Sequence, residues 1–242
     1  RYLGRPDAFS VDPRHLPLLD KDQLLPRQPD GTYGVLSDAG PNAWGAKLTA
    51  YLLRKDHKPL PGNPVEWFLQ SKHFGSGCLA FAPRPDEPPR LGEVPVRSSD
   101  LSARLLEALK IYLTDPDHKL DDETIQLLFP GSDLGGLRPK TIVMHDGHEH
   151  IAKFERPDDL FDVPAAEYAT LRLAHMAGIN VPNFELIPVG DRSALLVERF
   201  DRTEDGKRIH YLSANSILRP QPLSPDQRLS LIHISEPTRR RG

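Results

Sequence analysis

The sequence predicts an α+β protein in which a mainly helical part, up to about residue 125, precedes a strand–helix–strand part. Apolar side chains recur at helical spacing in the first part, most clearly in residues 101–113. In the second part, Asp146-Gly147 separates two strand-like runs, and this dipeptide favours the primed turn of a β-hairpin. Pro164 then sits in the first turn of a predicted helix. Together these features indicate helices followed by an antiparallel sheet with one helix.

The helical part is expected to contain four helices and two short extended segments. The helices at 46–54 and 101–113 follow apolar stripes, and the one near Pro64 starts with a proline in its first turn. We predict helices at residues 46–54, 64–69, 101–113 and 121–128, a short strand or turn at 33–36, and a strand at 78–81.

The second part begins with a glycine-rich loop at residues 131–140, which leads into the predicted hairpin. Gly178 is well placed to end the helix that comes after the hairpin. We predict strands at 141–144 and 150–154, a turn at 145–148, a helix from about 162 to 177, an extended segment at 181–188, a turn at 191–193 and a buried strand at 194–197.

The composition favours a folded protein of a reducing compartment. The chain has 242 residues, of which 38% are hydrophobic and 27% charged, and this balance argues against wholesale disorder. A net charge of −3 gives no general positive field for nucleic acid or anionic membranes. The single cysteine, Cys78, excludes an intramolecular disulfide, and no apolar run approaches the length of a membrane helix. We therefore expect a soluble, cytoplasmic protein without membrane contact.

The two ends of the chain read differently from the rest. The chain begins at Arg1, within sequence that is typical of the middle of a domain. Residues 231–242 (LIHISEPTRRRG) resemble a translated sequencing adapter, although an ordinary basic terminus is the alternative. We predict three regions, at residues 1–125, 126–222 and 223–242, the last being a non-native tail.

The loop 131–140 has the composition of a phosphate-binding loop. Glycines such as Gly135 and Gly136 let backbone N–H groups turn toward a phosphate and approach it closely. The loop matches neither Gly-x-Gly-x-x-Gly nor the Walker motif. Taken alone, it is better explained as a flexible connection into a hairpin, so its meaning depends on the residues that come after it.

Lys153 and Glu167 are the candidate charged residues of a pocket. Because strand side chains alternate, Ile151 and Lys153 share one face, where Ile151 would cover a base and Lys153 would reach phosphates. Glu167 heads an apolar helix stripe and needs a partner there, for which Lys153 is the candidate. If the pair is buried, losing one partner would cost about 3–5 kcal/mol. The alternatives are a solvated edge lysine and a glutamate placed by the helix dipole.

The segment 195–200 is the candidate hinge. An apolar strand leads into Glu198 and Phe200, where a backbone carbonyl and an N–H group would hold adenine. The alternative is a strand that ends in a polar turn at Asp201-Arg202, which we interpret as a local surface pair. Three histidines, at 145, 148 and 150, flank the predicted hairpin turn, and we predict no metal site there.

In this order, the segments resemble the successive signatures of HipA-family serine/threonine kinases, the toxins of type II toxin–antitoxin modules. The resemblance rests on residues 131–140 (GSDLGGLRPK), 150–157 (HIAKFERP), 164–182 (PAAEYATLRLAHMAGINVP) and 195–202 (LLVERFDR), with further likeness at 34–45 and 74–81. It implies a HipA-like N-terminal subdomain followed by a protein-kinase-like N-lobe, an antiparallel sheet plus one helix. The family's C-terminal lobe would be missing.

The resemblance implies a protein kinase that depends on ATP and Mg²⁺. On this basis Lys153 holds the phosphates, Glu167 orients Lys153, and the backbones of Glu198 and Phe200 hold adenine. Ser132 matches the serine at which family members autophosphorylate, and a phosphate there would add about −1.5 to −2 charges. The catalytic aspartate and the Mg²⁺ ligands are expected in the missing lobe. We therefore assign no catalytic residue here and predict that this fragment alone is inactive.

The resemblance also implies partners, namely a HipB-like DNA-binding antitoxin and a protein substrate. DNA would be contacted mainly through the antitoxin. Two alternatives stay open: a non-catalytic half-kinase module that binds nucleotide or antitoxin, and a phosphotransferase that acts on a small-molecule alcohol. The length of the loop 131–140 and the segment 197–202 argue against the second alternative.

Overall fold

The computed structural model describes most of the chain between Ala8 and Leu218. The described residues are 6, 8–18, 32–41, 43–71, 75–84, 86–89 and 95–218, so the predicted tail at 223–242 lies outside them. The chain divides into two compact units, one formed by Arg1–Val35 with Leu212–Gly242 and the other by Leu36–Tyr211. The second unit holds the sheet and every candidate site residue.

The smaller unit contains helix α7 (Ala214–Leu218). The Ser213 hydroxyl accepts a hydrogen bond from the Ser216 N–H at 3.1 Å, which caps the start of this helix. Gly34, the first residue of α1 (Gly34–Ala39), belongs to the same unit. A Cβ atom on Gly34 would lie 2.6 Å from the Ser216 side chain, so the glycine allows this close approach.

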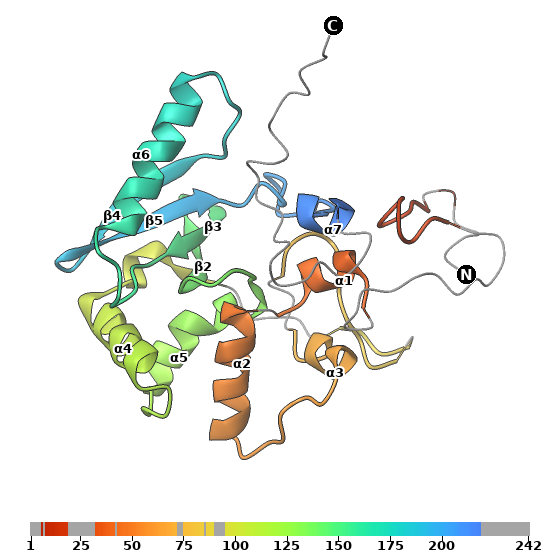
Figure 1. The fold of residues 1–242 in the computed structure, drawn as a ribbon, viewed down its shortest axis with the longest axis horizontal. Helices are drawn as coiled ribbons and strands as arrows, with labels where there is room; N and C mark the ends of the chain where they lie inside the picture. Colours follow the sequence, from red (N-terminus) through yellow and green to blue (C-terminus); the bar gives the residue numbers. More distant parts are fainter. Residues whose placement is uncertain are drawn as a thin grey trace, which may run out of the picture. The chain divides into compact units, whose positions relative to one another are not determined.

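The larger unit is built on one mixed sheet of five strands in the order β1-β2-β3-β5-β4. Figure 1 shows the sheet with helix α6 beside β4 and β5. The strands are β1 (Val96–Arg97), β2 (Lys140–His145), β3 (His148–Lys153), β4 (Phe184–Val189) and β5 (Arg192–Glu198). The short β1 runs parallel to β2, and the other neighbours are antiparallel. The architecture is therefore α+β, as the sequence predicts.

The β2–β3 hairpin is closed by the turn that the sequence predicts. Asp146 and Gly147 both have positive φ, 49° and 84°, as a primed two-residue turn requires. The turn sets the register, in which Ile142 lies opposite Ile151 and Lys140 lies opposite Lys153. A single hairpin therefore brings the end of the glycine-rich loop next to the candidate phosphate lysine.

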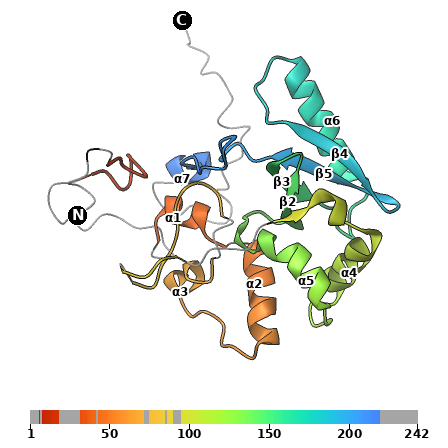
Figure 2. The same ribbon diagram turned by 180° about the vertical axis from the view of Figure 1, so that it is seen from behind.

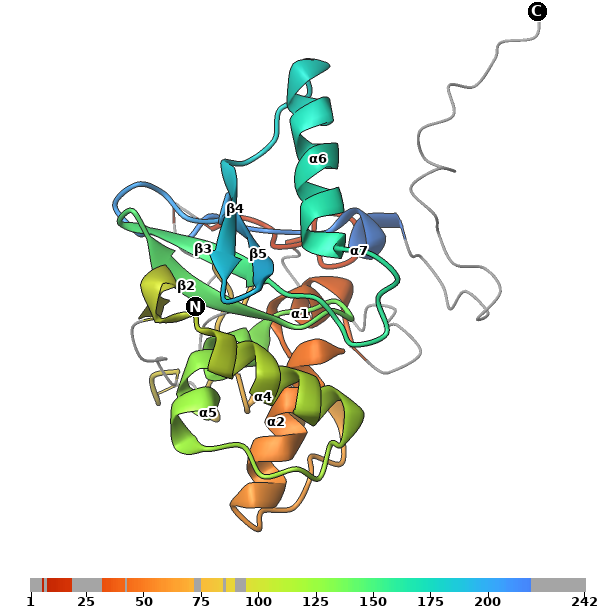
Figure 3. The same ribbon diagram turned by 90° about the vertical axis from the view of Figure 1, so that its left-hand side faces the viewer.

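The two faces of the sheet pack against different helices. On one face, Val143, Ala152 and Leu196 are fully buried in a core shared with the helices α2, α4 and α5. Figure 2 and Figure 3 show these three helices together on that side of the sheet. On the other face lies α6, whose Tyr168 ring contacts the Phe184 ring edge-on at 5.4 Å. The sheet is thus the middle layer of the unit.

The helices on the first face begin at recognisable caps and pack through aromatic rings. They are α2 (Trp44–Lys55), α4 (Ala103–Thr114) and α5 (Asp122–Leu128). The Ser102 side chain caps α4 and the Asp121 side chain caps α5, each by accepting an N–H bond three residues on. Trp44 and Tyr51 both meet the Tyr112 ring edge-on, at 6.3 and 5.3 Å. The predicted helices of this region are confirmed, with boundaries shifted by a few residues.

Two further predicted helices are also confirmed. Helix α3 (Pro64–Phe68) starts at the Asn63 cap, and α6 (Val163–Met176) starts at the Asp162 cap. Gly178 lies just after the end of α6 with φ 78°, the left-handed conformation expected of a glycine there. Within the described ranges, no helix combines the length and the apolar character that crossing a membrane requires.

Three local predictions are wrong. Residues 33–36, predicted as a strand or turn, include the start of helix α1. Residues 78–81 form no strand, since the segment joins no ladder among the described strands; its Phe81 ring stacks on the Phe68 ring at 4.9 Å. The first residues of the predicted loop 131–140 belong to a buried 3₁₀ turn, Phe129–Asp133. The predicted division of the chain near residue 125 stays a prediction.

The Tyr51 hydroxyl should be important for stability. It accepts the Leu120 N–H at 2.7 Å, inside the core, and Tyr51 is only 8% exposed. We expect Tyr51→Phe to destabilise the protein by about 1–3 kcal/mol, because the buried amide loses its acceptor. Urea unfolding measures the loss. Tyr168→Phe is the control, with an expected change within about 0.5 kcal/mol, and equal losses in both variants would contradict the assignment.

Candidate functional site

A cavity of about 300 Å³ opens between the glycine-rich loop and the β2–β3 hairpin. Gly135, Gly136, Ile151 and Lys153 line it, as the sequence predicts for a nucleotide pocket. Its other lining residues are Asp38, Ser76, Leu134, Lys140 and Tyr211. All of them belong to the larger compact unit. The loop and the return strand therefore do meet around one cavity.

Two lysines face each other in this cavity. Lys140 on β2 lies directly opposite Lys153 on β3, so both side chains leave the same face of the sheet. The Lys140 Nζ donates to the Gly135 carbonyl oxygen at 2.6 Å. Sequence reasoning missed Lys140, although counting outward from the two-residue turn would have placed it opposite Lys153. Like charges in directly opposed positions destabilise a sheet, so the arrangement calls for a negative partner.

Glu167 supplies one negative partner from helix α6. Its Oε1 accepts a hydrogen bond from the Lys153 Nζ, so the predicted pair is present. The two side chains are 27% and 35% exposed, which makes this a half-exposed pair rather than a buried one. A pair of this exposure contributes about 1 kcal/mol or less to stability. Substituting either residue should therefore leave the fold intact.

The pKa of Lys140 is shifted by its surroundings. Burial and, to a smaller extent, the nearby Lys153 charge lower this pKa from the usual 10.5 to about 8, while Glu167 acts in the opposite direction. At neutral pH most Lys140 side chains therefore remain in the charged ammonium form. The cavity thus offers two ammonium donors to a ligand, while the Asp38 carboxylate also lines it and the Glu167 carboxylate pairs with Lys153.

The loop that covers the cavity depends on its glycines. Gly136 has φ +87°, and a Cβ atom there would lie 2.5 Å from the Lys140 Nζ. A Cβ atom on Gly131 would lie 2.1 Å from the Lys140 carbonyl oxygen. Both positions thus need a residue without a side chain. Ser132, in contrast, does not line the cavity but lies in the buried 3₁₀ turn, only 2% exposed.

The predicted hinge residues line a different cavity. Glu198 and Phe200 border a larger space of about 640 Å³, together with residues 180–183. Phe200 is 64% exposed, and its ring contacts the Tyr211 ring with centroids 5.8 Å apart. Because Tyr211 lines the first cavity, Phe200 is connected to it through one side chain. The structure therefore brings Gly135, Gly136, Ile151 and Lys153 together around the cavity and adds Glu167 through its pair with Lys153. It leaves Ser132, Glu198 and Phe200 outside the lining.

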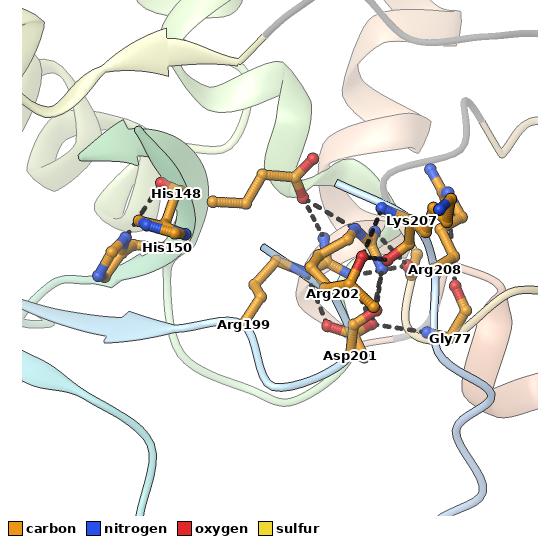
Figure 4. A network of polar contacts seen from close by, with 11 residues as sticks. Gly77, His148, His150, Arg199, Asp201, Arg202, Lys207 and Arg208 are labelled. Carbon is orange, nitrogen blue, oxygen red and sulfur yellow. Dashed lines mark hydrogen bonds and ion pairs between the residues drawn. The ribbon is translucent and has the colours of Figure 1, made fainter. Parts of the chain in front are cut away.

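The chain after β5 is held by a buried charge network, drawn in Figure 4. Asp201 accepts hydrogen bonds from the Arg199 guanidinium and from the Gly77 N–H, the latter at 2.7 Å. Arg202 bonds the same carboxylate at 3.0 Å and reaches Glu149 at 3.2 Å. The prediction of a surface pair at Asp201-Arg202 is wrong, because their side chains are only 7% and 6% exposed. The network joins the segment around Gly77 to the hinge.

Opposing effects set the pKa of Asp201. Burial alone would raise it, but hydrogen bonds and charges from Arg199, the Gly77 N–H and Arg202 outweigh burial and lower it below its usual value. Burial also lowers the pKa of Arg202, and the neighbouring Arg199 charge adds to this effect. The carboxylate is therefore held ionised between two arginines.

The histidines of the hairpin form polar contacts of their own. His145 bonds the Ser98 hydroxyl at 2.8 Å and the Glu185 carboxylate at 3.0 Å. His150 is buried, and burial lowers its pKa. Figure 4 shows His148 and His150 apart from the arginines. In the part of the chain that the structure describes, no group of three or more histidine, cysteine or acidic side chains is placed to hold a metal ion.

Comparison with known proteins places the site in a family context. Residues 132–240 match the family of the HipA-like C-terminal domain. A curated relative, the serine/threonine-protein kinase toxin HipA of Shewanella oneidensis, is 28% identical over 138 residues, which are 52% of this chain and 29% of that protein. The chain thus spans less than a third of this relative's length.

A solved structure also resembles the chain. It is the complex of the Shewanella oneidensis MR-1 toxin–antitoxin system HipA, HipB and its operator DNA. The likeness covers 81% of this chain and 43% of the solved chain, with 22% sequence identity and a TM-score of 0.48.

Lys140 should titrate well below an ordinary lysine. We expect a midpoint at about pH 8 in an NMR titration of the lysine side chains. Lys153→Met should raise this value because a neighbouring charge disappears, and Glu167→Gln should lower it for the opposite reason. Since the unfolded chain keeps this proton up to about pH 10.5, the Lys140 contribution to stability should rise with pH between the two values. A Lys140 titration midpoint that stays the same in both variants would contradict the assigned geometry.

Asp201 should be essential to the fold near the hinge. We expect Asp201→Asn to cost about 3–5 kcal/mol, because the buried arginines lose their carboxylate. The folded pKa of Asp201 lies below 3.8, so this contribution is complete above pH 3.8 and disappears as the pH falls through the folded value. Denaturant unfolding of both proteins between pH 2 and 7 tests this. Asp205→Asn, at a residue whose side chain is 58% exposed, is the matched control.

Proposed function

Because this chain belongs to the HipA family, we propose that its larger unit forms the nucleotide-binding lobe of an ATP-dependent protein serine/threonine kinase. The observation that carries the proposal is the pair of opposed lysines beneath the glycine loop, one of them paired with Glu167. Protein kinases hold ATP phosphates with a strand lysine that is fixed by a helix glutamate. The sheet with α6 on one face supports the comparison with a kinase N-lobe.

The phosphates of ATP are assigned to the glycine loop and the two lysines. Lys153 bonds phosphate oxygens while Glu167 holds its ammonium group in place. Lys140 adds a second ammonium group from the opposite strand, after exchanging the Gly135 carbonyl for a phosphate oxygen. Ammonium–phosphate hydrogen bonds are charge-assisted and therefore stronger than neutral ones. These groups suit a polyphosphate better than a neutral ligand.

The adenine is assigned to the apolar side of the same cavity and to the backbones of Glu198 and Phe200, so the nucleotide would have to extend beyond the lining of this cavity to the residues that border the other one. Ile151 and Leu134 supply the surface on the apolar side. The Glu198 N–H already donates to the Asn183 carbonyl at 2.8 Å, so its contribution to adenine would be its carbonyl oxygen. Phe200 would contribute its backbone N–H, next to Tyr211. This division between the two residues refines the hinge that the sequence predicts.

ATP would bring Mg²⁺, which neutralises phosphate charge during phosphoryl transfer. The residues of the cavity fit the phosphates, and we assign neither a metal ligand nor a catalytic base to the described residues. This chain's part in the reaction is to bind the nucleotide, to orient its phosphates and to hold Lys153 in place through Glu167.

The proposed biological context is that of the family. We assign the protein to a HipA-type toxin–antitoxin module, with a HipB-like DNA-binding antitoxin as partner and a protein as phosphate acceptor. The net charge of −3 agrees with DNA contact made mainly by the antitoxin. Ser132 is the proposed site of regulatory phosphorylation. Because Ser132 is buried, a phosphate of about −1.5 to −2 charges there requires the 3₁₀ turn to open.

Both lysines should be needed for ATP binding. We expect Lys153→Ala and Lys140→Ala each to weaken ATP binding about 10- to 100-fold, the value of one charge-assisted hydrogen bond of about 1.5–3 kcal/mol. Calorimetric titration with ATP measures the affinity. Lys110→Ala, at a lysine that is 58% exposed on α4, should leave the affinity for ATP unchanged.

The thermal unfolding temperature of each lysine variant should stay near that of the parent, since the Lys153–Glu167 pair is half-exposed. Unchanged ATP affinity in both cavity variants would contradict the proposed pocket. In a full-length protein that includes the C-terminal lobe, transfer of phosphate to a small-molecule alcohol instead of a protein would contradict the proposed acceptor.

A further inference from the structure

Helix α2 begins without a side-chain cap from its N-cap residue. Its N-cap residue, Ala43, has a positive φ of 44° and makes no side-chain hydrogen bond to the helix. The first N–H groups of a helix have no partner within the helix and need acceptors from elsewhere. Here the Trp44 N–H donates to the Gly136 carbonyl at 2.9 Å, and the Gly45 N–H donates to the Leu134 carbonyl at 3.2 Å. The glycine loop is therefore the cap of α2.

The Trp44 side chain makes a third bond to the same region. Its indole Nε1–H donates to the Lys140 carbonyl at 2.8 Å, and the side chain is only 1% exposed. Lys140 is the first residue of β2 and lines the cavity. The start of α2 thus holds the loop at two carbonyls and the strand after the loop at one.

Gly45 fits against the loop because it has no side chain. A Cβ atom there would lie 2.2 Å from the Ser132 carbonyl oxygen and 2.8 Å from the Leu134 carbonyl oxygen. Both contacts are with backbone atoms, which cannot rotate away as the end of a side chain can. Any residue other than glycine at position 45 must displace either the loop or the helix.

We propose that Trp44 and Gly45 are positioning residues for the glycine loop of the phosphate pocket. In a planar trans peptide the C=O and the following N–H point in opposite directions. By holding the Leu134 and Gly136 carbonyls, α2 turns the N–H groups of Gly135 and Leu137 away from itself. The assignment of phosphate as the ligand rests on the proposed function, whereas the holding of the loop does not.

The same contacts control Ser132. The Ser132 carbonyl lies against Gly45, and the side chain is buried while the loop is docked on α2. A loop released from α2 would lose the two hydrogen bonds that its carbonyls accept from the Trp44 and Gly45 N–H groups and would expose this serine. The loop therefore cannot be docked on α2 while Ser132 is being modified. Helix α2 thus controls the accessibility of the proposed regulatory serine.

Three glycine substitutions separate loop positioning from general destabilisation. Gly45→Ala places a methyl group against the loop, and Gly40→Ala places one 2.4 Å from the Phe68 ring, away from the loop. Gly62→Ala is the control without a clash, because the nearest atom to its Cβ would be a Glu66 carboxylate oxygen at 3.7 Å. Helix propensity alone would make Gly45→Ala stabilising, so a loss there has to come from the clash.

Hydrogen exchange in the whole chain tests the positioning directly. In the parent protein the amides of Trp44 and Gly45 should be protected from exchange, although they are the first two residues of a helix. Gly45→Ala should speed exchange at positions 44 and 45 and across 134–137 at least tenfold relative to both Gly40→Ala and Gly62→Ala. Loop exchange equal to that of Gly40→Ala would overturn the proposal.

ATP titration of the same proteins distinguishes the two claims. Gly45→Ala should bind ATP at least tenfold more weakly than Gly40→Ala. Trp44→Phe, which keeps an aromatic ring but loses the indole donor, should bind ATP about threefold more weakly than the parent. If the parent binds no ATP, the proposed function fails and hydrogen exchange still decides the positioning role. If Gly45→Ala binds ATP like the parent and its amides stay protected, the positioning role fails and the function stands.

Discussion

The opposition of Lys140 and Lys153 across the β2–β3 hairpin is the constraint on which the site depends. A primed two-residue turn fixes the register, and the register forces two ammonium groups onto one face of the sheet. Glu167 offsets part of their repulsion from α6, and the Gly135 carbonyl accepts one Lys140 hydrogen bond. Because Asp38 also lines the cavity, the proposed binding of phosphate rests on the two ammonium donors and the glycine loop rather than on an excess of positive charge.

The cavity is assembled from parts of the chain that lie far apart in sequence. The loop before β2 is held by the start of α2, and the core beneath the sheet is shared between the strands and the N-terminal helices. Buried arginines tie the end of β5 to the segment around Gly77. Consequently, the phosphate side and the hinge side of the site are each fixed by residues that make no direct contact with the cavity.

Elements with local signals are predictable from the sequence. Asp146-Gly147, Pro164 in the first turn of α6 and the apolar stripe of α4 each act within a few residues, and the structure confirms the turn and both helices. The pairing of Lys153 with Glu167 is also predictable, because a glutamate at the head of an apolar stripe needs a cation. These signals are enough to place four residues of the cavity and the partner of Lys153.

Features that depend on distant contacts escape prediction. No local motif marks Lys140 as a site residue, because its role depends on the pairing with Lys153 that appears only when residues are counted outward from the Asp146-Gly147 turn. Charged side chains usually lie on the surface, whereas the burial of Asp201 depends on Arg199 and on the distant Gly77. Residues 78–81 have the composition of a strand, but Phe81 is used for packing on Phe68. In each case tertiary contacts override the local pattern.

The most direct test of a phosphate pocket at this hairpin is an NMR titration of the isotope-labelled chain with ATP. If the pocket binds ATP as proposed, the amide signals of Gly135, Gly136, Lys140, Ile151 and Lys153 should shift in a saturable manner. A titration that leaves these signals in place, or that shifts only residues 180–183 around the larger cavity, would contradict it.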